Sequence, residues 1–222
     1  MKDSIRIGAF IFFFGLILLH PMGLNTSMTN NESPSTNEPP SISASGIATA
    51  YFAGGCFWCM EPVFDALAGV TDTTVGYMGG KEETANYNDV SSGRTQHVEA
   101  IQVSYDPNVV SYATLLMAFW QSIDPTDPSG QFADKGPHYQ TAIFIKNESG
   151  RAEVEASIQA LLKKKSYDSP IATKILLEQP FYKAEEYHQN YYKKNAVHYN
   201  AYKVGSGRSG YLQQAWGKPT DN

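Results

Sequence analysis

The chain contains only two cysteines, Cys56 and Cys59, which lie three positions apart. Neither a framework of several disulfides nor a zinc site made of four cysteines of one chain can therefore hold the fold together. The 222 residues suffice for one well-buried domain but are few for two. The chain must fold around a hydrophobic core, which its 42% hydrophobic and 18% charged residues allow.

The charge balance excludes two classes of partner. Seventeen Lys and Arg residues stand against 22 Asp and Glu residues, which gives a formal net charge of −5. Nucleic-acid binding and polybasic membrane binding both need a positive surface. We therefore expect no nucleic-acid partner, and a membrane contact only through an N-terminal anchor.

Residues 1–24 are typical of a signal peptide. Ile7–Leu19 is an uncharged apolar run of 13 residues that follows Lys2 and Arg6. Because a membrane span needs about 20 residues, an export signal is favoured, and an uncleaved anchor that extends to Leu24 is the alternative. The expected location is exported: periplasmic, secreted or in the secretory pathway.

The next segment, residues 25–47, is predicted to be a disordered tether. Within residues 25–45, 16 of 21 residues are Ser, Thr, Asn or Pro, and such a stretch buries too little apolar area to offset its ordering entropy. The folded domain is expected at residues 48–217, and residues 218–222 are a short tail.

Hydrophobic periodicity predicts alternating strands and helices in that domain. The expected strands are Thr49–Ala53, Val70–Tyr77, Val98–Tyr105, Thr141–Ile145 and Ile171–Leu177. The expected helices are Cys56–Leu67, Ser111–Ser122 and Glu148–Lys165. Long loops are expected at Gly79–Gln96 and Asp124–His138, and an irregular tyrosine-rich segment after Pro180. This order predicts an α+β two-layer sandwich with a mixed sheet, a ferredoxin-like (split βαβ) core and a long irregular C-terminal segment.

The two cysteines lie where a strand ends and a helix begins, directly after Gly54-Gly55. The helix dipole and unpaired N–H groups at such a place stabilise a thiolate, so we expect a lowered pKa for Cys56 and a nucleophilic sulfur. Cys59 follows almost one helical turn later, within reach for a disulfide. A reactive thiol followed by a resolving thiol is what a redox cycle needs.

Three other interpretations of the C-x-x-C pair remain open. It could be half of a zinc site, a thioredoxin-like disulfide oxidoreductase centre, or a structural disulfide across a short loop, which would contribute little stability. A second pair of zinc ligands at the usual spacing is not found among four of the histidines, His97, His138, His188 and His198. Phe57 and Trp58 are either core residues or the walls of an apolar pocket for a methyl or thioether group.

The string GGCFWCMEPVF, from Gly54 to Phe64, resembles the active-site signature of the A-type peptide methionine sulfoxide reductases. Further segments resemble motifs of that family in the same order: GYMGG at 76–80, NYNDVSSG at 86–93, HVEA at 97–100, YDP at 105–107, FWQSIDPT at 119–126, DKGPHY at 134–139 and FYKAEEYHQ at 181–189. The resemblance extends from about Ala50 to Trp216.

The resemblance implies reduction of methionine-S-sulfoxide, free or in proteins, to methionine. In that reaction Cys56 would attack the sulfoxide sulfur, and Phe57 and Trp58 would hold the methyl group of the substrate. It also implies no metal or other cofactor, an external thiol reductant of the thioredoxin or glutaredoxin type, and a monomer.

The family's oxygen-binding residues correspond to Glu99, Tyr87 and Tyr139, with Asp134 in support. Thiolate attack on a sulfoxide needs an acid for the developing oxyanion, and Glu99 can serve only if burial raises its pKa. From the residues alone, Glu99 could equally be a strand carboxylate that faces solvent, and the two tyrosines could be ordinary loop packing.

The chain departs from the family pattern in the regeneration of the thiol. Many relatives carry glycine at position 59 and resolving cysteines near the C-terminus, whereas the only internal candidate here is Cys59. Lys135 and Gln140 stand where some relatives carry histidine and arginine.

Overall fold

The computed structural model describes residues 46–217. The predicted leader at 1–24, residues 25–45 of the tether and the tail at 218–222 lie outside the described residues. Within 46–217, no helix is long and apolar enough to cross a membrane.

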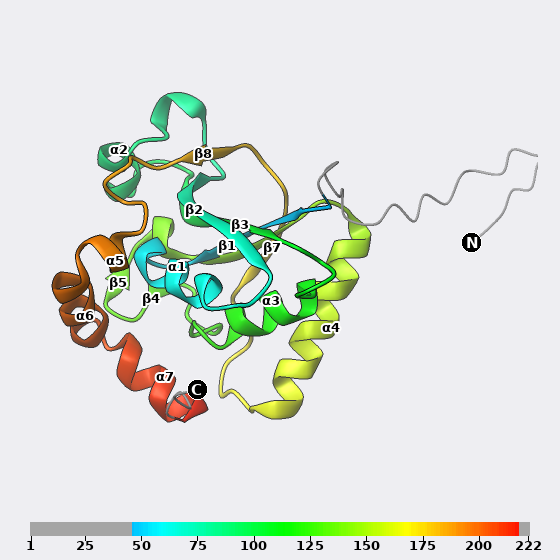
Figure 1. Ribbon diagram of the computed structural model, residues 1–222. Helices are drawn as coiled ribbons and strands as arrows, with labels where there is room; N and C mark the ends of the chain where they lie inside the picture. The colour runs from blue at the N-terminus through cyan, green and yellow to red at the C-terminus, as the bar shows by residue number, and fades with distance from the viewer. Residues whose placement is uncertain (1–45, 218–222) are drawn as a thin grey trace, which may run out of the picture. The chain divides into compact units, whose positions relative to one another are not determined.

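Six strands form one mixed sheet in the order β7-β6-β1-β3-β2-β8 (Figure 1). Their bounds are β1 Ala48–Gly54, β2 Val70–Met78, β3 Val98–Tyr105, β6 Thr141–Ile145, β7 Lys174–Leu177 and β8 Phe181–Lys183. Every neighbouring pair is antiparallel except β6 and β7, which are parallel. β3 thus lies between the parallel strands β1 and β2, which is the split βαβ arrangement. The predicted α+β fold with a ferredoxin-like core and mixed sheet is confirmed.

Three helices pack on one face of this sheet: α1 Phe57–Asp65, α3 Tyr112–Trp120 and α4 Glu148–Lys164. Their apolar faces join the strand side chains in the main core, where Phe52 of β1 stacks between Phe64 and Phe119 at centroid distances of 5.0 and 5.2 Å. Burial of such aromatic area is the main stabilising contribution in a domain of this size. A smaller buried cluster on other strand positions contains Met78 and Phe144.

The two predicted long loops contain short elements. The first includes the 3₁₀ helix η1 (Glu82–Thr84) and helix α2 (Tyr87–Ser91), and Asn86 caps α2 by accepting from the backbone N–H of Asp89. The second includes the hairpin of β4 (Gly130–Gln131) and β5 (Asp134–Lys135), followed by the 3₁₀ helix η2 (Pro137–Tyr139). These elements position several of the site residues.

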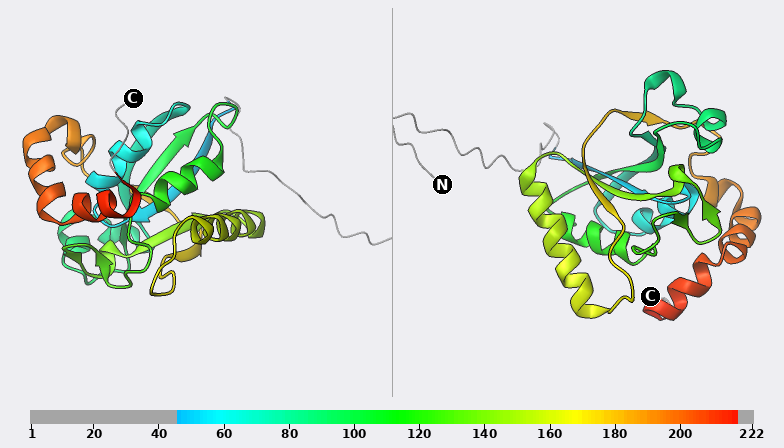
Figure 2. Two further views of the ribbon diagram at one scale, coloured as in Figure 1. Left: turned by 90° about the horizontal axis from the view of Figure 1, so that it is seen from below. Right: turned by 180° about the vertical axis from the view of Figure 1, so that it is seen from behind.

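The segment after Pro180 is not irregular as predicted. It contains β8 and then three helices, α5 Tyr191–Lys194, α6 Ala196–Gly205 and α7 Arg208–Trp216, drawn in orange and red (Figure 2). These helices are four, ten and nine residues long, and several of their apolar positions are tyrosines, whose polar hydroxyls obscure the helical pattern. Their stability comes from tertiary contacts, as when Lys165, at the end of α4, lies 5.1, 5.1 and 5.4 Å from the ring centres of Tyr167, Tyr211 and Trp216.

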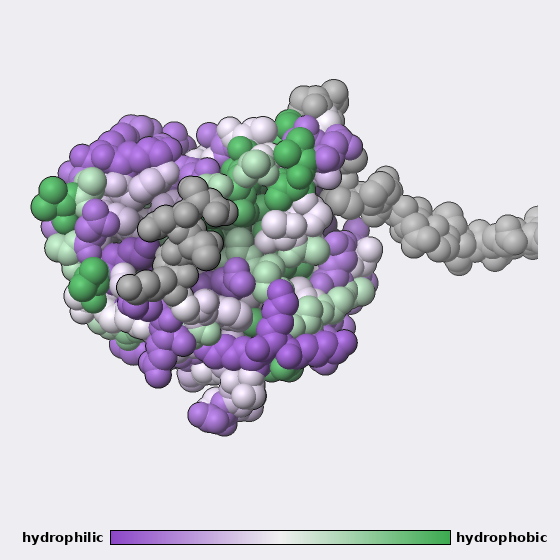
Figure 3. All heavy atoms as spheres, turned by 60° about the horizontal axis from the view of Figure 1, so that its bottom comes forward, coloured by the Kyte–Doolittle hydropathy of each residue, from purple (hydrophilic) through white to green (hydrophobic). Residues whose placement is uncertain are grey.

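The surface of the described domain is mixed in polarity. On the face drawn in Figure 3, hydrophobic residues gather in one area between polar ones. The most exposed large hydrophobic side chain is Val197 of α6, at 87%.

Candidate active site

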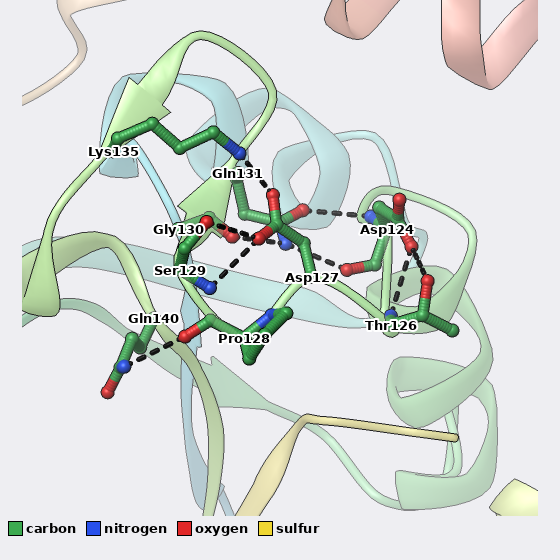
Figure 4. Close-up of polar contacts among 9 residues, drawn as sticks. All are labelled: Asp124, Thr126, Asp127, Pro128, Ser129, Gly130, Gln131, Lys135 and Gln140. Atoms are coloured by element: carbon green, nitrogen blue, oxygen red, sulfur yellow. Dashed lines mark hydrogen bonds and ion pairs between the residues drawn. The ribbon is translucent and has the colours of Figure 1, made fainter. Parts of the chain in front are cut away.

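The turn between β1 and α1 is held in place by the loop that contains β4. Gly55 has a φ of +80°, a conformation that favours glycine. A Cβ at this position would lie 2.6 Å from the Cβ of Gln131, so only glycine fits beside this side chain. Gln131 is fully buried, and its amide bonds both the N–H and the C=O of Asp124 at 2.8 Å (Figure 4). The turn therefore delivers Cys56 to the start of α1 in a fixed position.

Cys56 is the N-cap residue of α1, and both thiols are nearly inaccessible, at 4% and 2% exposure for Cys56 and Cys59. Burial raises the pKa of the Cys56 thiol well above its ordinary value, and its hydrogen bond to Cys59 and the charge of Glu99 add to this effect. The lowered pKa predicted for Cys56 is wrong in this state, because desolvation and these neighbours outweigh the helix terminus. The same hydrogen bond, the positive charge of Arg208 and that of Lys203 lower the pKa of Cys59 to about 7, against its burial.

Glu99 lies on β3 and faces the helix-covered side of the sheet, since its side chain is 2% exposed. Its Oε2 accepts a hydrogen bond of 2.9 Å from the backbone N–H of Phe57, the first residue of α1. Burial raises the pKa of this carboxyl to about 8, although the Phe57 N–H acts in the opposite direction. Glu99 is therefore protonated at neutral pH and can donate a proton next to Cys56.

Aromatic rings surround the cysteine turn. Phe57 is buried, with its ring 5.0 Å from the His188 ring, while the half-buried Trp58 stacks on Tyr191 at 3.8 Å. The indole N–H of Trp58 donates to Nδ1 of His188 at 3.0 Å. Phe57 and Trp58 pack against these neighbours, and because they directly follow Cys56 at the start of α1, they place two aromatic side chains beside that thiol.

Three tyrosines and one carboxylate complete the site. The Tyr202 hydroxyl donates to Oδ2 of Asp134 at 2.5 Å, and it can instead donate to the Cys56 sulfur when that is a thiolate. Burial raises the pKa of Tyr87 and Tyr139, and the charges of Glu99 and Cys56 raise it further in both. Neither of those two hydroxyls has a hydrogen-bond partner among the described residues, so both are free to donate to a bound oxygen atom.

This combination of a buried thiol pair, a protonated carboxyl, free tyrosine donors and an apolar wall suits reduction of a sulfoxide. Residues 48–220 match the family model described as peptide methionine sulfoxide reductase. The chain belongs to this family. It reduces methionine-S-sulfoxide to methionine, which decides among the interpretations of the cysteine pair that the sequence left open.

The match with this chain covers nearly the whole length of several similar proteins. A peptide methionine sulfoxide reductase MsrA of Bacillus licheniformis is 49% identical over 172 residues, which are 78% of this chain and 95% of the relative. The Bacillus subtilis MsrA is 49% identical over 168 residues, 76% and 95% of the two chains. Among solved structures, reduced Mxr1 of Saccharomyces cerevisiae superposes with a TM-score of 0.64 at 30% identity, covering 72% of this chain and 91% of that one. The methionine sulfoxide reductase A of Corynebacterium diphtheriae gives 0.60 at 30% identity, with coverages of 72% and 84%.

In this methionine sulfoxide reductase, the structure brings all eight sequence-predicted site residues into one region. Cys56 interacts through hydrogen bonding or charge with four of them: Cys59, Glu99, Tyr87 and Tyr139. Asp134 joins this group through the effect of its charge on Glu99 and through its hydrogen bond from Tyr202. Across residues 46–217 no group of three or more side chains could hold a metal ion.

Sequence reasoning missed four residues of the site, all from the C-terminal part: His188, Tyr191, Tyr202 and Arg208. The signal for His188 was available, since it lies in the FYKAEEYHQ segment that resembles the family. The two tyrosines were hidden in a tyrosine-rich stretch whose helices had no recognisable pattern.

Two further departures from the family pattern lie at the β4–β5 hairpin and just after it: Lys135 is in β5, and Gln140 directly follows η2. Lys135 forms an ion pair with Asp127, and the Gln140 side chain donates to the C=O of Pro128 at 2.9 Å (Figure 4). Both stabilise the loop that precedes and carries Asp134.

Proposed function

We propose that Cys56 is the nucleophile of this methionine-S-sulfoxide reductase and that Cys59 resolves the sulfenic acid which the reaction leaves on Cys56. The observation that carries this proposal is the buried Glu99 carboxyl, bonded to the N–H next to Cys56 and protonated at neutral pH because its pKa is about 8. A protonated carboxyl at this place can supply the proton that the sulfoxide oxygen needs as its negative charge develops.

In the first half of the reaction, Cys56 attacks the sulfoxide sulfur while Phe57 and Trp58 hold the methyl group. Its thiol proton passes to Cys59, which accepts its hydrogen bond and has a pKa of about 7. Glu99 donates its proton to the sulfoxide oxygen, and that oxygen remains on Cys56 as the sulfenic acid when methionine leaves.

The oxygen is held by further donors as its charge develops. Tyr87 and Tyr139 supply two hydroxyls that have no other partner within residues 46–217, and the raised pKa of both keeps them protonated. Fixed donors of this kind stabilise a transition state without reorganising. Asp134 acts on the site through its hydrogen bond from Tyr202 rather than by proton transfer.

In the second half, the Cys59 sulfur attacks the Cys56 sulfur to form a disulfide and release water. Cys59 is one turn along the same chain segment, and its backbone N–H bonds the C=O of Cys56 at 3.0 Å. An external thiol donor of the thioredoxin or glutaredoxin type then reduces the disulfide. No other cofactor is needed, because both electrons come from thiols.

The N-terminal sequence supports a proposal for where the enzyme acts. We propose an exported monomer whose leader at 1–24 is a signal peptide or an anchor, and whose tether at 25–47 separates the domain from a membrane or cleavage site. Its substrates are oxidised proteins and free methionine sulfoxide.

The test is a single turnover of the fully reduced protein with excess methionine-S-sulfoxide and no reductant. We expect about one methionine released and two thiols lost per chain, since each sulfur is used once. The Cys59→Ser variant is the matched control and should still release one methionine while it loses one thiol. Methionine release by Cys56→Ser would contradict the assignment of the nucleophile, and two methionines from the wild type would contradict the role of Cys59.

A further inference from the structure

Arg208, the first residue of α7, is a buried positive charge. Its side chain is 1% exposed, and among residues 46–217 it forms no ion pair with a carboxylate. Its Nε has no hydrogen-bond partner in that part of the chain. Burying a charge without a counter-charge is strongly unfavourable, so a residue of this kind needs a compensating anion at some stage.

The polar contacts of Arg208 place it at the active-site turn. Nη2 donates to the C=O of Gly54 at 3.0 Å, and Nη1 donates to the C=O of Ser122 at 2.7 Å. A Cβ at Gly55 would lie 3.0 Å from Nη2. The guanidinium also lies over the Phe132 ring at 4.7 Å, which fixes its plane. Two neutral carbonyls accept hydrogen bonds from the guanidinium but leave its charge uncompensated.

The cysteine pair directly follows this turn, and the reaction creates negative charge on its sulfurs. Among the charged groups that lower the pKa of Cys59, Arg208 has the largest effect and Lys203 has a smaller one. The other lowering influence is the hydrogen bond from the Cys56 thiol. That thiol proton is gone once Cys56 has become a sulfenic acid, so the charges of Arg208 and Lys203, of which Arg208 has the larger effect, persist into the second half of the reaction.

We propose that Arg208 is a positioning residue for disulfide formation: its buried guanidinium stabilises the negative charge on the Cys59 sulfur while that sulfur attacks the sulfenic acid of Cys56. This role rests on the proposed function of Cys59 as the resolving thiol. In the step, a bond forms between the two sulfurs and the S–O bond of Cys56 breaks. Cys59 is oxidised and the sulfenic sulfur is reduced. The proton that Cys59 lost leaves with the hydroxide as water, so no further reactant is needed.

Several other groups act on the Cys59 charge, and the test must separate them from Arg208. The titratable or charged groups that face Cys59 are Cys56, Glu99, Asp134, Tyr199, Lys203 and Arg208. Lys203 is the useful control, since it is also cationic, comes from α6 and is only half-buried.

The first measurement is the pKa of Cys59 in the full chain. In a Cys56→Ser background Cys59 is the only thiol, and its thiolate absorbs ultraviolet light, which allows titration between about pH 5 and 9. A chain without cysteines supplies the blank. Adding Arg208→Gln should raise the midpoint by about one pH unit. Arg208→Lys, which keeps the charge, should leave the midpoint near that of the background, and Lys203→Gln should raise it by less than Arg208→Gln does.

The second measurement is a rapid-quench single turnover that follows methionine release and thiol loss separately. Below the Cys59 midpoint, Arg208→Gln should slow thiol loss about tenfold, because one pH unit removes about nine-tenths of the thiolate. Methionine release should slow as well, since the Cys59 thiolate also accepts the Cys56 proton, whereas Arg208→Lys should leave both rates near those of the wild type. A purely structural role would not move the midpoint.

An unmoved midpoint in Arg208→Gln overturns the proposal, and so does an equal rise in Arg208→Lys. If Arg208→Gln does not fold, the Lys variant decides alone: a raised midpoint refutes the charge effect, and a retained midpoint with normal thiol loss supports it. Absence of methionine release in the wild type would instead refute the proposed function. The two failures are therefore distinguishable.

Discussion

Glu99→Gln should stabilise the protein at alkaline pH while it inactivates the enzyme. Glutamine keeps the shape of the side chain, and its carbonyl oxygen can still accept the hydrogen bond that the Phe57 N–H makes with Glu99 at 2.9 Å. It removes the proton that the mechanism assigns to the sulfoxide oxygen. It also removes the ionisation of a carboxyl that is almost fully buried.

The magnitude follows from the shift in pKa. Burial raises the pKa of Glu99 from the ordinary 4.5 to about 8. Between these two values the folded chain holds a proton that the unfolded chain has lost. The contribution of Glu99 is therefore fully favourable below about pH 4.5, and it is lost as the pH rises towards 8. The whole loss is about 5 kcal/mol, since each pKa unit corresponds to about 1.4 kcal/mol.

The assay is urea unfolding of the reduced wild type and of Glu99→Gln over this pH range. The stability difference in favour of the variant should grow by about 1.4 kcal/mol per pH unit and then level off above pH 8. Glu155→Gln, at an exposed position of α4, is the control and should follow the wild type in parallel. Methionine release by Glu99→Gln should fall by about 10²- to 10⁴-fold. Parallel stability curves for the wild type and Glu99→Gln would refute the buried, protonated state of Glu99.

Three further substitutions test other parts of the site. Tyr202→Phe removes the hydroxyl that bonds Asp134 and the nucleophile. Single-turnover methionine release should therefore slow by about tenfold, which corresponds to about 1.4 kcal/mol. An unchanged rate would show that this hydroxyl has no part in the reaction. Trp58→Phe keeps an aromatic wall but loses an indole hydrogen bond, so KM for methionine sulfoxide should rise by about fivefold; steady-state kinetics with the same KM would contradict this. Lys165→Met should lower Tm by about 4 °C in calorimetry, because three ring contacts are lost, two of them to the C-terminal segment, whereas exposed Lys164→Met should not.

The core of the fold could be predicted from sequence because its signals are local. The alternation in Val98–Tyr105 and the helical spacing in Cys56–Leu67 each correspond to an observed element, β3 and α1. The helices after Pro180 could not be predicted in this way, since their stability depends on contacts with distant residues. Lys165 and the Trp216 ring, for example, are 51 positions apart in the chain but lie 5.4 Å from each other.

The sequence predicted which residues make up the site better than it predicted their pKa values. The position of Cys56 at a helix start correctly indicated the turn, but the expected thiolate there was wrong. A helix terminus acts on a thiol only as strongly as burial allows, and the burial of Cys56, which is 4% exposed, arises from the tertiary structure and not from the local sequence. The same burial, which the sequence could not establish for Glu99, is what makes that residue an acid.

Burial therefore has opposite consequences for the two groups that the first step needs. It keeps Glu99 protonated, which favours proton donation, and it keeps Cys56 protonated, which hinders attack. A second thiol with a pKa of about 7, hydrogen-bonded to the first, resolves this conflict because it can accept the proton of Cys56 within the dry site. Cys59 on this argument acts twice, first as the acceptor of that proton and then as the attacking sulfur. The spacing of one helical turn serves both steps, since each requires direct contact between the two sulfurs.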